Sequence, residues 1–387
     1  MSNIYMDNAA TTKVREEVSD SMISVLKNNY GNPSSSHSYG RSAKSIIELS
    51  RNEIAKTLNV KNSEIIFTSG GTEGDNLIIR NSIKYLDVKH IITSKIEHHA
   101  VTHTVDDLQE NKKIKVSYVK LSSDGNIDYD DLENLLSNSN NKTLVSLMHI
   151  NNEIGNILDI SRVADLTKKY SAYFHSDTVQ SIGHYEMDLK KYNIDFVVAS
   201  AHKFHGPKGV GFVYINNKTK LGPFFTGGMQ EKGVRAGTEC VHNIFGMSEA
   251  LKHSTNNLKK EKTYITKLKK YFITKLIKLN HNITFNGKSN DFDNSTYTLV
   301  NISIPIKKQN AELLMFKLDL KGIACSKGSA CQSGSDLGSH VLREIQNNNN
   351  YQFISLRFSF SIYNTEKEID VVVKEIENLI IKNQDPN

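Results

Sequence analysis

The stretch that decides the fold is an apolar run followed at once by a polar, glycine-rich turn. It reads Phe196-Val197-Val198-Ala199-Ser200-Ala201-His202-Lys203-Phe204-His205-Gly206-Pro207-Lys208-Gly209. The first four residues predict a buried strand, so Lys203 lies just beyond its carboxyl end, where open α/β sheets place their ligands. A lysine amine reacts with an aldehyde once burial or a nearby cation lowers its pKa. The alternative is a surface lysine in a glycine-rich loop.

Outward from this stretch, short apolar runs alternate with longer amphipathic runs. We expect strands at 65–68, 91–94, 115–119, 143–150, 172–175 and 196–199, and helices at 73–83, 98–109, 128–136 and 161–170. Strands that alternate with helices of about 10–15 residues indicate a largely parallel sheet covered on both faces.

The pattern changes near residue 241. We expect one long helix to about residue 279, strands at 297–304, 322–325 and 353–360, and a last helix at 366–381. The sequence therefore predicts a large α/β domain at 16–255, with a mostly parallel sheet. It also predicts a smaller α+β domain formed by 1–15 and 256–387, with the N-terminal residues packed on it.

Composition excludes several classes of function. The chain has 387 residues and a formal net charge of +6, which is mild for this length, and its short basic runs read as solvated faces. We expect no direct nucleic-acid partner. With three cysteines, Cys240, Cys325 and Cys331, there is no disulfide framework, which favours a reducing compartment. Neither a secretory signal nor a long apolar stretch is apparent, so we expect no membrane segment and a cytoplasmic location.

A second turn offers a site for an anion. Ser69-Gly70-Gly71-Thr72-Glu73 lies between an expected strand and an expected helix. Gly71 lets the backbone approach a ligand, Thr72 adds a hydroxyl, and the helix N-terminus presents free N–H groups to a phosphate. The spacing matches neither nucleotide-binding glycine fingerprint. The alternative is an ordinary helix-capping turn.

A third element carries an acid. Asp177 follows the expected strand at 172–175, and Gln180 comes three residues later. A carboxylate there can keep a pyridinium nitrogen protonated, and Gln180 can reach a neighbouring ring substituent such as a phenolic oxygen. The alternative for Asp177 is an N-cap. Taken together, a lysine, an acid and a phosphate turn at strand ends of one sheet match what pyridoxal 5′-phosphate (PLP) requires.

The chain resembles the cysteine desulfurases of the NifS/IscS group, in the class V branch of PLP-dependent aminotransferase-like enzymes. The resemblance covers nearly the whole length. It rests on the segments Asp7-Asn8-Ala9-Ala10-Thr11-Thr12, Gly31-Asn32-Pro33-Ser34-Ser35, 67–73, Glu97-His98, Asn151-Asn152-Glu153-Ile154-Gly155, Arg235-Ala236-Gly237-Thr238 and Arg357-Phe358-Ser359. It implies the fold type I of PLP-dependent transferases.

The resemblance also implies roles for single residues. Lys203 would carry PLP as a Schiff base, with Asp177 on the ring nitrogen, Gln180 on the phenolic oxygen and His98 stacked on the ring. The phosphate would be held by Thr72, Ser200 and His202, and by Thr238 from the second subunit of a homodimer. Asn152 and Arg357 would hold the substrate L-cysteine, Arg357 through its carboxylate, to which a guanidinium fork is suited. For Arg357 the alternative is a structural ion pair.

Cys331 distinguishes this group from other PLP enzymes. It lies in Cys325-Ser326-Lys327-Gly328-Ser329-Ala330-Cys331-Gln332-Ser333-Gly334-Ser335. A stretch rich in Gly and Ser is typical of an exposed loop, and Gly-Ser-Ala-Cys resembles the nucleophile loop of the group. The resemblance implies that Cys331 takes the sulfur of cysteine as a persulfide, and it allows a transient iron–sulfur ligand there without a resident metal. Cys325 is expected in the core and Cys240 to be incidental.

Residues 332–340 depart from the group's pattern. They read Gln-Ser-Gly-Ser-Asp-Leu-Gly-Ser-His, where the best-known members read Thr-Ser-Ala-Ser-Leu-Glu-Pro-Ser-Tyr. The departure leaves open the sulfur acceptor, which could be an iron–sulfur scaffold or a tRNA-thiolation protein. Two rivals stay open: a selenocysteine lyase or aminotransferase on the same cofactor, and a metal-binding or sulfur-carrier protein that uses His98, His99 and His103.

Overall fold

A computed structural model describes residues 3–112, 114–307, 311–327, 338–345 and 353–384. Its larger sheet has seven strands in the order β2-β8-β7-β6-β5-β3-β4. They are β2 (Ile65–Thr68), β8 (Gly211–Ile215), β7 (Phe196–Ser200), β6 (Tyr173–Asp177), β5 (Thr143–Ser146), β3 (His90–Thr93) and β4 (Lys115–Tyr118). Only β8 runs against its neighbours; the other adjacent pairs are parallel.

Helices cover both faces of this sheet, because successive strand residues point to opposite sides. On β7, Phe196 and Val198 enter the core formed with α3 (Gly71–Leu86) and α4 (His99–Lys112). Val197 and Ala199 enter the core on the other face. That face is covered by α1 (Glu16–Asn28), α2 (Ser38–Thr57), α5 (Tyr129–Ser137), α6 (Ile160–Lys169) and the first part of α7 (Val241–Lys278). Because most strands of this sheet are parallel, their carboxyl ends lie at one edge.

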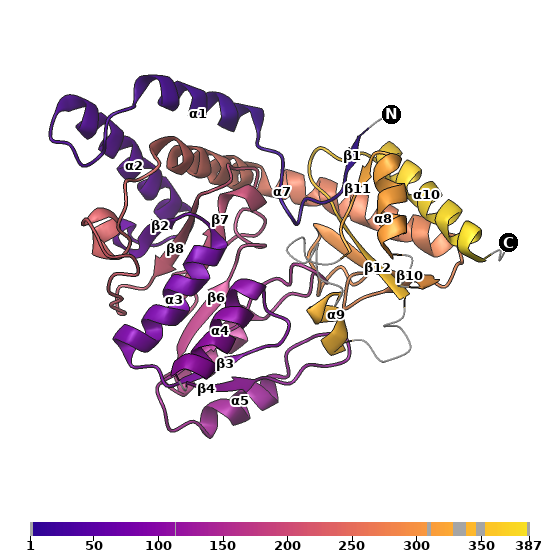
Figure 1. Ribbon diagram of the computed structural model, residues 1–387, viewed down its shortest axis with the longest axis horizontal. Coiled ribbons are helices and arrows are strands. Elements are labelled where there is room, and N and C mark those ends of the chain that lie inside the picture. Colours follow the sequence, from indigo (N-terminus) through magenta and orange to yellow (C-terminus); the bar gives the residue numbers. More distant parts are fainter. Residues whose placement is uncertain (1–2, 113, 308–310, 328–337, 346–352, 385–387) are drawn as a thin grey trace.

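The C-terminal part of the chain forms a second, separate core. Its antiparallel sheet has the order β12-β10-β9, and β1 pairs in parallel with β11 beside it. The elements of the second core are β12 (Phe353–Ser359), β10 (Leu299–Lys307), β9 (Thr284–Phe285), β1 (Ile4–Tyr5) and β11 (Ile323–Ala324), with helices α8 (Ala311–Leu320) and α10 (Glu366–Gln384). In Figure 1 they lie on the opposite side of the molecule from α3 and β4. Helix α9 (His340–Ile345) packs instead with Ile96 and Ile154 in a small separate cluster.

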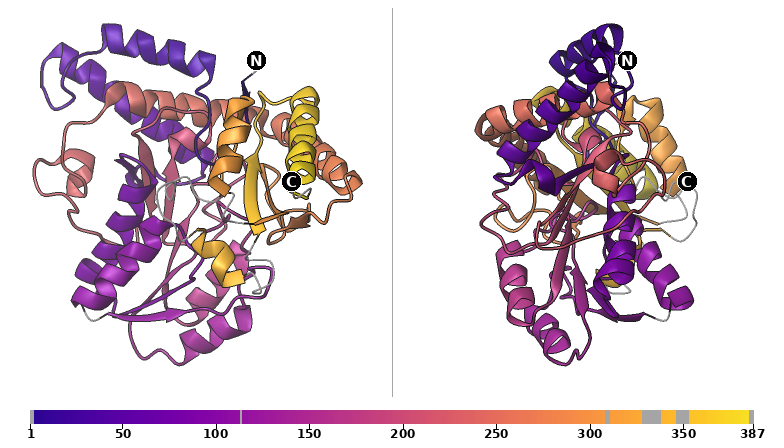
Figure 2. Two further views of the ribbon diagram at one scale, coloured as in Figure 1. Left: turned by 45° about the vertical axis from the view of Figure 1, so that its right-hand side comes forward. Right: turned by 90° about the vertical axis from the view of Figure 1, so that its left-hand side faces the viewer.

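One long helix connects the two cores. The first part of α7 buries Ile244 and Leu251 against the large sheet, and its later part buries Leu268 and Phe272 in the second core. Figure 1 shows α7 passing from one side of the molecule to the other. The left view of Figure 2 separates the orange and yellow C-terminal elements from the indigo and magenta ones. We propose the division at 15/16 and 255/256 as the domain boundary, with α7 continuous through it.

Several expected elements differ in the structure. The strand expected at 143–150 ends at Ser146, although Leu147 and His149 still donate backbone hydrogen bonds to β6. The helix expected from residue 73 begins at Gly71, and Asp177 is the last residue of β6 rather than a residue beyond it. The expected elements lacked strands β1, β8 and β9 and helices α1, α2, α8 and α9. Strict strand–helix alternation misses β8, because only a short turn separates it from β7.

None of the described helices combines the length and the apolar character needed to cross a membrane.

Candidate active site

A cavity of about 190 Å³ lies at the carboxyl ends of β6 and β7, beside the N-terminus of α3. Its wall contains ten of the residues singled out from the sequence: Gly71, Thr72, His98, Asn152, Asp177, Gln180, Ser200, His202, Lys203 and Arg357. These residues come from points spread over nearly 290 positions of the chain. The structure therefore brings the three predicted elements, the lysine, the acid and the anion turn, to one place.

Lys203 ends a short 3-10 turn, Ala201–Lys203, directly after β7. Its Nζ donates hydrogen bonds to the backbone oxygens of Ala9 (2.7 Å) and Ala10 (2.8 Å). Gln180 Nε2 also donates to Ala9 O, at 3.0 Å. The N-terminal segment thus passes over the lysine and holds its ammonium group at the cavity.

Asp177 is buried at the base of the cavity. Its Oδ1 accepts a hydrogen bond from the Val179 N–H at 2.9 Å. Burial raises the pKa of Asp177 to about 6, and the Val179 N–H and the Lys203 ammonium oppose that rise. The carboxyl group is therefore mainly ionised at neutral pH, as an acid that holds a ring nitrogen proton must be.

The anion turn is shaped by two glycines. Gly70 has a φ angle of +151°, which residues that carry a Cβ rarely adopt. A Cβ at Gly71 would lie 2.9 Å from Val179 Cγ2, so the backbone there comes close to its neighbours only because the residue is glycine. Glu73 accepts the Ser69 N–H at 2.8 Å. The start of α3 lines the cavity with Gly71 and Thr72, together with Ser200 and His202. A bare helix N-terminus with hydroxyl groups beside it is a good place for a phosphate.

His98 is half-buried and stands at the other side of the cavity. Its Nδ1 accepts the Ala100 N–H at 3.2 Å. Burial lowers its pKa to about 4, and the Lys203 ammonium adds to that effect. The imidazole is therefore neutral at neutral pH, which suits a side chain that stacks on a ring or transfers a proton.

Arg357 is almost fully buried and is held by two partners. Its Nη1 donates to the backbone oxygen of Asn152 at 2.7 Å, and its Nη2 donates to Asp7 Oδ1 at 3.0 Å. The ion pair that was the alternative interpretation for Arg357 is thus present, with Asp7. Arg357 nevertheless lines the cavity, so the ion pair orients a guanidinium group that faces it.

Thr238 and Cys325 lie outside this cavity. Thr238 is exposed and is not among the residues that line this cavity. Cys331 lies outside the described residues. Cys325 is half-buried against the second core, and burial raises the pKa of its thiol to about 12, which makes it unreactive.

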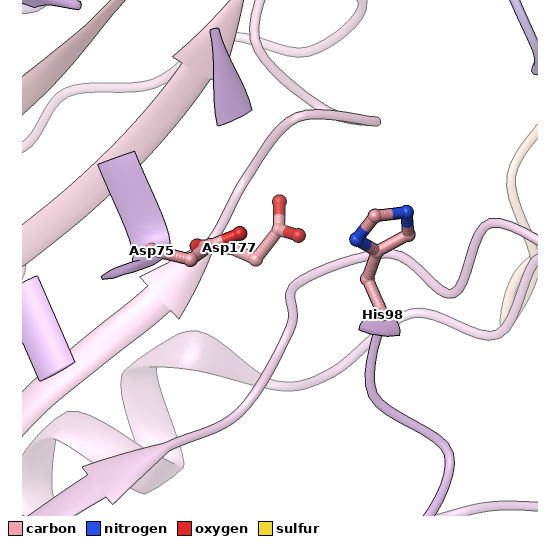
Figure 3. Close-up of side chains that lie close together, drawn as sticks. All are labelled: Asp75, His98 and Asp177. Carbon is pink, nitrogen blue, oxygen red and sulfur yellow. The ribbon is translucent and has the colours of Figure 1, made fainter. Parts of the chain in front are cut away.

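The sequence reasoning missed Asp75, which also lines the cavity. Asp75 is four residues beyond Gly71 on α3, so helical periodicity places it on the same face as the anion turn. Figure 3 shows Asp75, Asp177 and His98 in a row, with Asp177 in the middle. One oxygen or nitrogen from each side chain lies within 4.8 Å of the others. Ala9 and Ala10 were missed as well, because only their backbone oxygens take part.

The histidines considered as a metal site are arranged differently. The His99 ring contacts His103 and His340, with centroids 4.5 Å and 4.3 Å apart. His340 Nε2 bonds to the Glu97 backbone oxygen at 2.8 Å, which leaves that nitrogen unavailable to a metal. Within the described ranges, the group of donors close enough to share an ion is instead Asp75, His98 and Asp177, beside the Lys203 amine.

The residues present fit PLP. The same cavity is lined by the Lys203 amine, the buried Asp177 carboxyl group and the N-terminus of α3. At that N-terminus, a Cβ on Gly71 would fill part of the space. These groups complement the aldehyde, the ring nitrogen and the phosphate of PLP. Lys203, Asp177 and the Gly71–Thr72 turn would hold these three parts.

Comparison with known proteins identifies the family. The chain matches the family described as aminotransferase class-V over residues 4–372. It is 40% identical over 382 residues to a cysteine desulfurase IscS of Dictyoglomus turgidum, covering 98% of this chain and 95% of that protein. A solved NifS-like protein superposes with a TM-score of 0.89 at 34% identity, covering 98% of this chain and 100% of that chain. The structure described as SspA in complex with cysteine gives a TM-score of 0.80 at 30% identity, covering 94% of this chain and 100% of that one. The chain therefore belongs to the aminotransferase class-V family, with the type I fold of PLP-dependent enzymes, and within it to the PLP-dependent cysteine desulfurases.

Proposed function

We propose that this enzyme converts L-cysteine to L-alanine and leaves the sulfur as a persulfide on Cys331. The observation that carries the proposal is the cavity in which Lys203, Asp177 and the N-terminus of α3 converge. The reaction balances as L-cysteine plus the Cys331 thiol giving L-alanine plus the Cys331 persulfide. The carbon–sulfur bond of the substrate breaks, and a sulfur–sulfur bond forms on the enzyme.

PLP, when bound, supplies an electron sink next to the substrate Cα. Asp177 holds the proton on the ring nitrogen, and Gln180 and His98 orient the ring. Gly71, Thr72, Ser200 and His202 hold the phosphate. Lys203 moves the proton at the substrate Cα, since its amine lies in the cavity. The neutral imidazole of His98 is placed to pass a proton to or from the substrate.

Arg357 and Asn152 bind the substrate. Arg357, supported by Asp7 and by the Asn152 backbone, pairs with the substrate carboxylate through its guanidinium group. Asn152 also lines the cavity and bonds to the substrate. L-Cysteine as substrate is supported by the cysteine desulfurase relatives and by the related protein that was solved with cysteine.

We also propose a cytoplasmic homodimer that passes sulfur to a protein acceptor. Thr238 is exposed and away from its own cavity, which supports a role in the cavity of a second subunit. The IscS relatives favour iron–sulfur assembly proteins as acceptors, with tRNA thiolation as the other outlet. The small number of cysteines supports a reducing compartment.

The test measures alanine and sulfide formed from L-cysteine by the wild type, Cys331→Ala and Lys203→Ala. We expect both variants to lose at least about a thousandfold in turnover, as when a covalent nucleophile is removed. Only Lys203→Ala should also lose the visible absorption of bound PLP. Lys208→Ala is the matched control, because Lys208 is exposed in the same loop. Unchanged turnover in Cys331→Ala would favour an aminotransferase or a lyase without a cysteine nucleophile.

A further inference from the structure

Asp75 is a buried acid at the cavity to which the proposed chemistry gives no role. It lies on α3, is 1% exposed and lines the same cavity as Asp177. In Figure 3 its carboxyl group points toward Asp177, on the side away from His98. The two acids approach within 4.8 Å of each other. Two carboxyl groups thus share the base of the cavity.

The basic group beside Asp75 is an imidazole rather than an ammonium or guanidinium group. Asp75 Oδ1 lies 3.4 Å from Nε2 of His175 on β6. The other ring nitrogen of His175 bonds to Ser146 Oγ at 2.9 Å. Burial lowers the pKa of His175 to about 3, so this ring is uncharged at neutral pH. The Lys203 ammonium opposes the rise in the pKa of Asp177.

A third buried acid, Glu97, also influences Asp75. Glu97 is 2% exposed, accepts hydrogen bonds from Ser94 Oγ and the Met148 N–H, and has its pKa raised to about 8 by burial. Burial, Asp177 and Glu97 together raise the pKa of Asp75 well above its ordinary value. When two buried carboxyl groups share a site, the better-solvated or better-paired one keeps the charge and the pKa of the other rises. Here that one is Asp177, which has the Val179 N–H and the Lys203 ammonium.

We infer that Asp75 is a positioning residue that acts as a neutral acid and leaves Asp177 as the one charged carboxylate at the base of the cavity. The inference rests on the proposed function, in which that charge meets the protonated ring nitrogen of PLP. Asp75 fills the space beside Asp177 and adds no second negative charge there. An amide has the same shape and no charge, so asparagine should replace Asp75 in this role.

The first test reads the protonation of Asp75 directly. An infrared spectrum of the holoenzyme should contain a carboxylic-acid carbonyl band that disappears in Asp75→Asn. Isotope-labelled aspartate in the wild type should shift the same band, so the assignment does not depend on the variant folding. Glu97→Gln is the control, since it removes only a glutamic-acid band. If the wild type has no labelled carboxylic-acid band near neutral pH, Asp75 is ionised and the inference is wrong.

The second test measures the affinity for PLP by titrating the apoprotein and following the visible absorption. We expect Asp75→Asn to stay within about threefold of the wild type, and Asp75→Ala to bind about tenfold more weakly, as for other residues that support a ligand-binding group. A loss above about tenfold in Asp75→Asn, or no loss in Asp75→Ala, would overturn the inference. If the wild type itself fails to bind PLP, the proposed function fails instead, and the infrared result on the apoprotein still decides the state of Asp75.

Discussion

At the scale of single residues, the cavity shows how position sets charge. Asp177 and Asp75 are the same amino acid a few ångströms apart, yet the first has an N–H donor and an ammonium group nearby and the second has a neutral imidazole. The side chain that can be solvated by the protein keeps its charge. The charge of each carboxyl group at this site is therefore set by the groups around it rather than by the type of amino acid.

A pH dependence of cofactor binding follows from Asp177. Its pKa is raised from 3.8 to about 6, so in the apoprotein the carboxylate is present above that value and is lost as the pH falls through it. The affinity for PLP should therefore drop between about pH 7 and pH 5, by up to about tenfold per pH unit.

Equilibrium titration with PLP at several pH values measures this dependence. The PLP phosphate also titrates near pH 6, so the wild type is compared with Asp177→Asn, which keeps the phosphate contribution and loses that of the carboxyl group. Identical pH profiles for the two proteins would contradict the assigned role of Asp177.

At the scale of elements, α3 is held against the sheet by a glycine. A Cβ at Gly74 would lie 2.7 Å from Val198 Cγ1 on β7 and 2.9 Å from Val213 Cγ1 on β8. Both valines are fully buried, and β-branched side chains have few other rotamers. The close approach of helix and sheet brings the anion turn at one end of α3 near the lysine turn at the end of β7.

Substituting Gly74 should therefore separate these elements. We expect Gly74→Val to lower the free energy of unfolding by about 2–3 kcal/mol through overpacking. Gly74→Ala should be milder, because the gain of about 1 kcal/mol in helix propensity offsets part of the strain. Urea unfolding measures both. Lys84→Val places the same side chain on the exposed part of α3 and should cost only a few tenths of a kcal/mol. Equal losses at positions 74 and 84 would exclude the packing explanation.

A second prediction at this scale concerns Lys269, a buried lysine on helix α7. Lys269 is fully buried, and its Nζ donates to Ser295 Oγ and to Thr296 O, both at 2.7 Å. Burial lowers its pKa from 10.5 to about 7. Between about pH 7 and pH 10 the unfolded chain thus binds more protons at this site than the folded chain, so stability should rise with pH, by at most about 1.4 kcal/mol per unit.

The measurement is urea unfolding of the wild type and Lys269→Met across that pH range. The rise should be present in the wild type and flattened in Lys269→Met. Lys270→Met removes an exposed neighbouring lysine and should keep the wild-type slope. A wild-type slope that survives in Lys269→Met would assign the effect to other groups.

At the scale of the whole molecule, the N-terminal segment joins the two cores through the active site. Met6 lies in the second core, and Asp7 pairs with Arg357 on β12. Ala9 O then accepts a hydrogen bond from Lys203, and the Thr12 N–H donates to His202 O at 2.8 Å. The segment thus places the substrate-binding arginine and the lysine relative to each other.

Loss of the Asp7 charge should affect substrate binding first. Asp7 Oδ1 holds Arg357 Nη2 and also accepts a hydrogen bond from Ser326 Oγ at 2.7 Å. In Asp7→Asn the guanidinium group loses its ion pair and its fixed orientation. We expect KM for L-cysteine to rise about tenfold with kcat changed less than about threefold. Asp20→Asn, on the exposed side of α1, is the control. A fall in KM would show that Asp7 competes with the substrate for Arg357 instead.

Much of the site could be predicted from the sequence. Lys203, Asp177 and the Gly71–Thr72 turn each follow or end a strand, and strand–helix periodicity places all three at one edge of a parallel sheet. Asp75 was within reach of the same reasoning, since it lies one helical turn from Gly71. The backbone oxygens of Ala9 and Ala10 were not, because a backbone contact leaves no trace in residue type.

The sequence by itself determined the alternation of strands and helices from β2 to β7, the residues at the strand ends and, through the motifs, the family. These depend on local periodicity and on chemistry carried by single side chains. Only the tertiary structure decided the pairing of Arg357 with Asp7, 350 residues apart, and the unequal surroundings of Asp75 and Asp177. Both depend on which distant groups are buried together, and the cost of burying a charge is set by those groups.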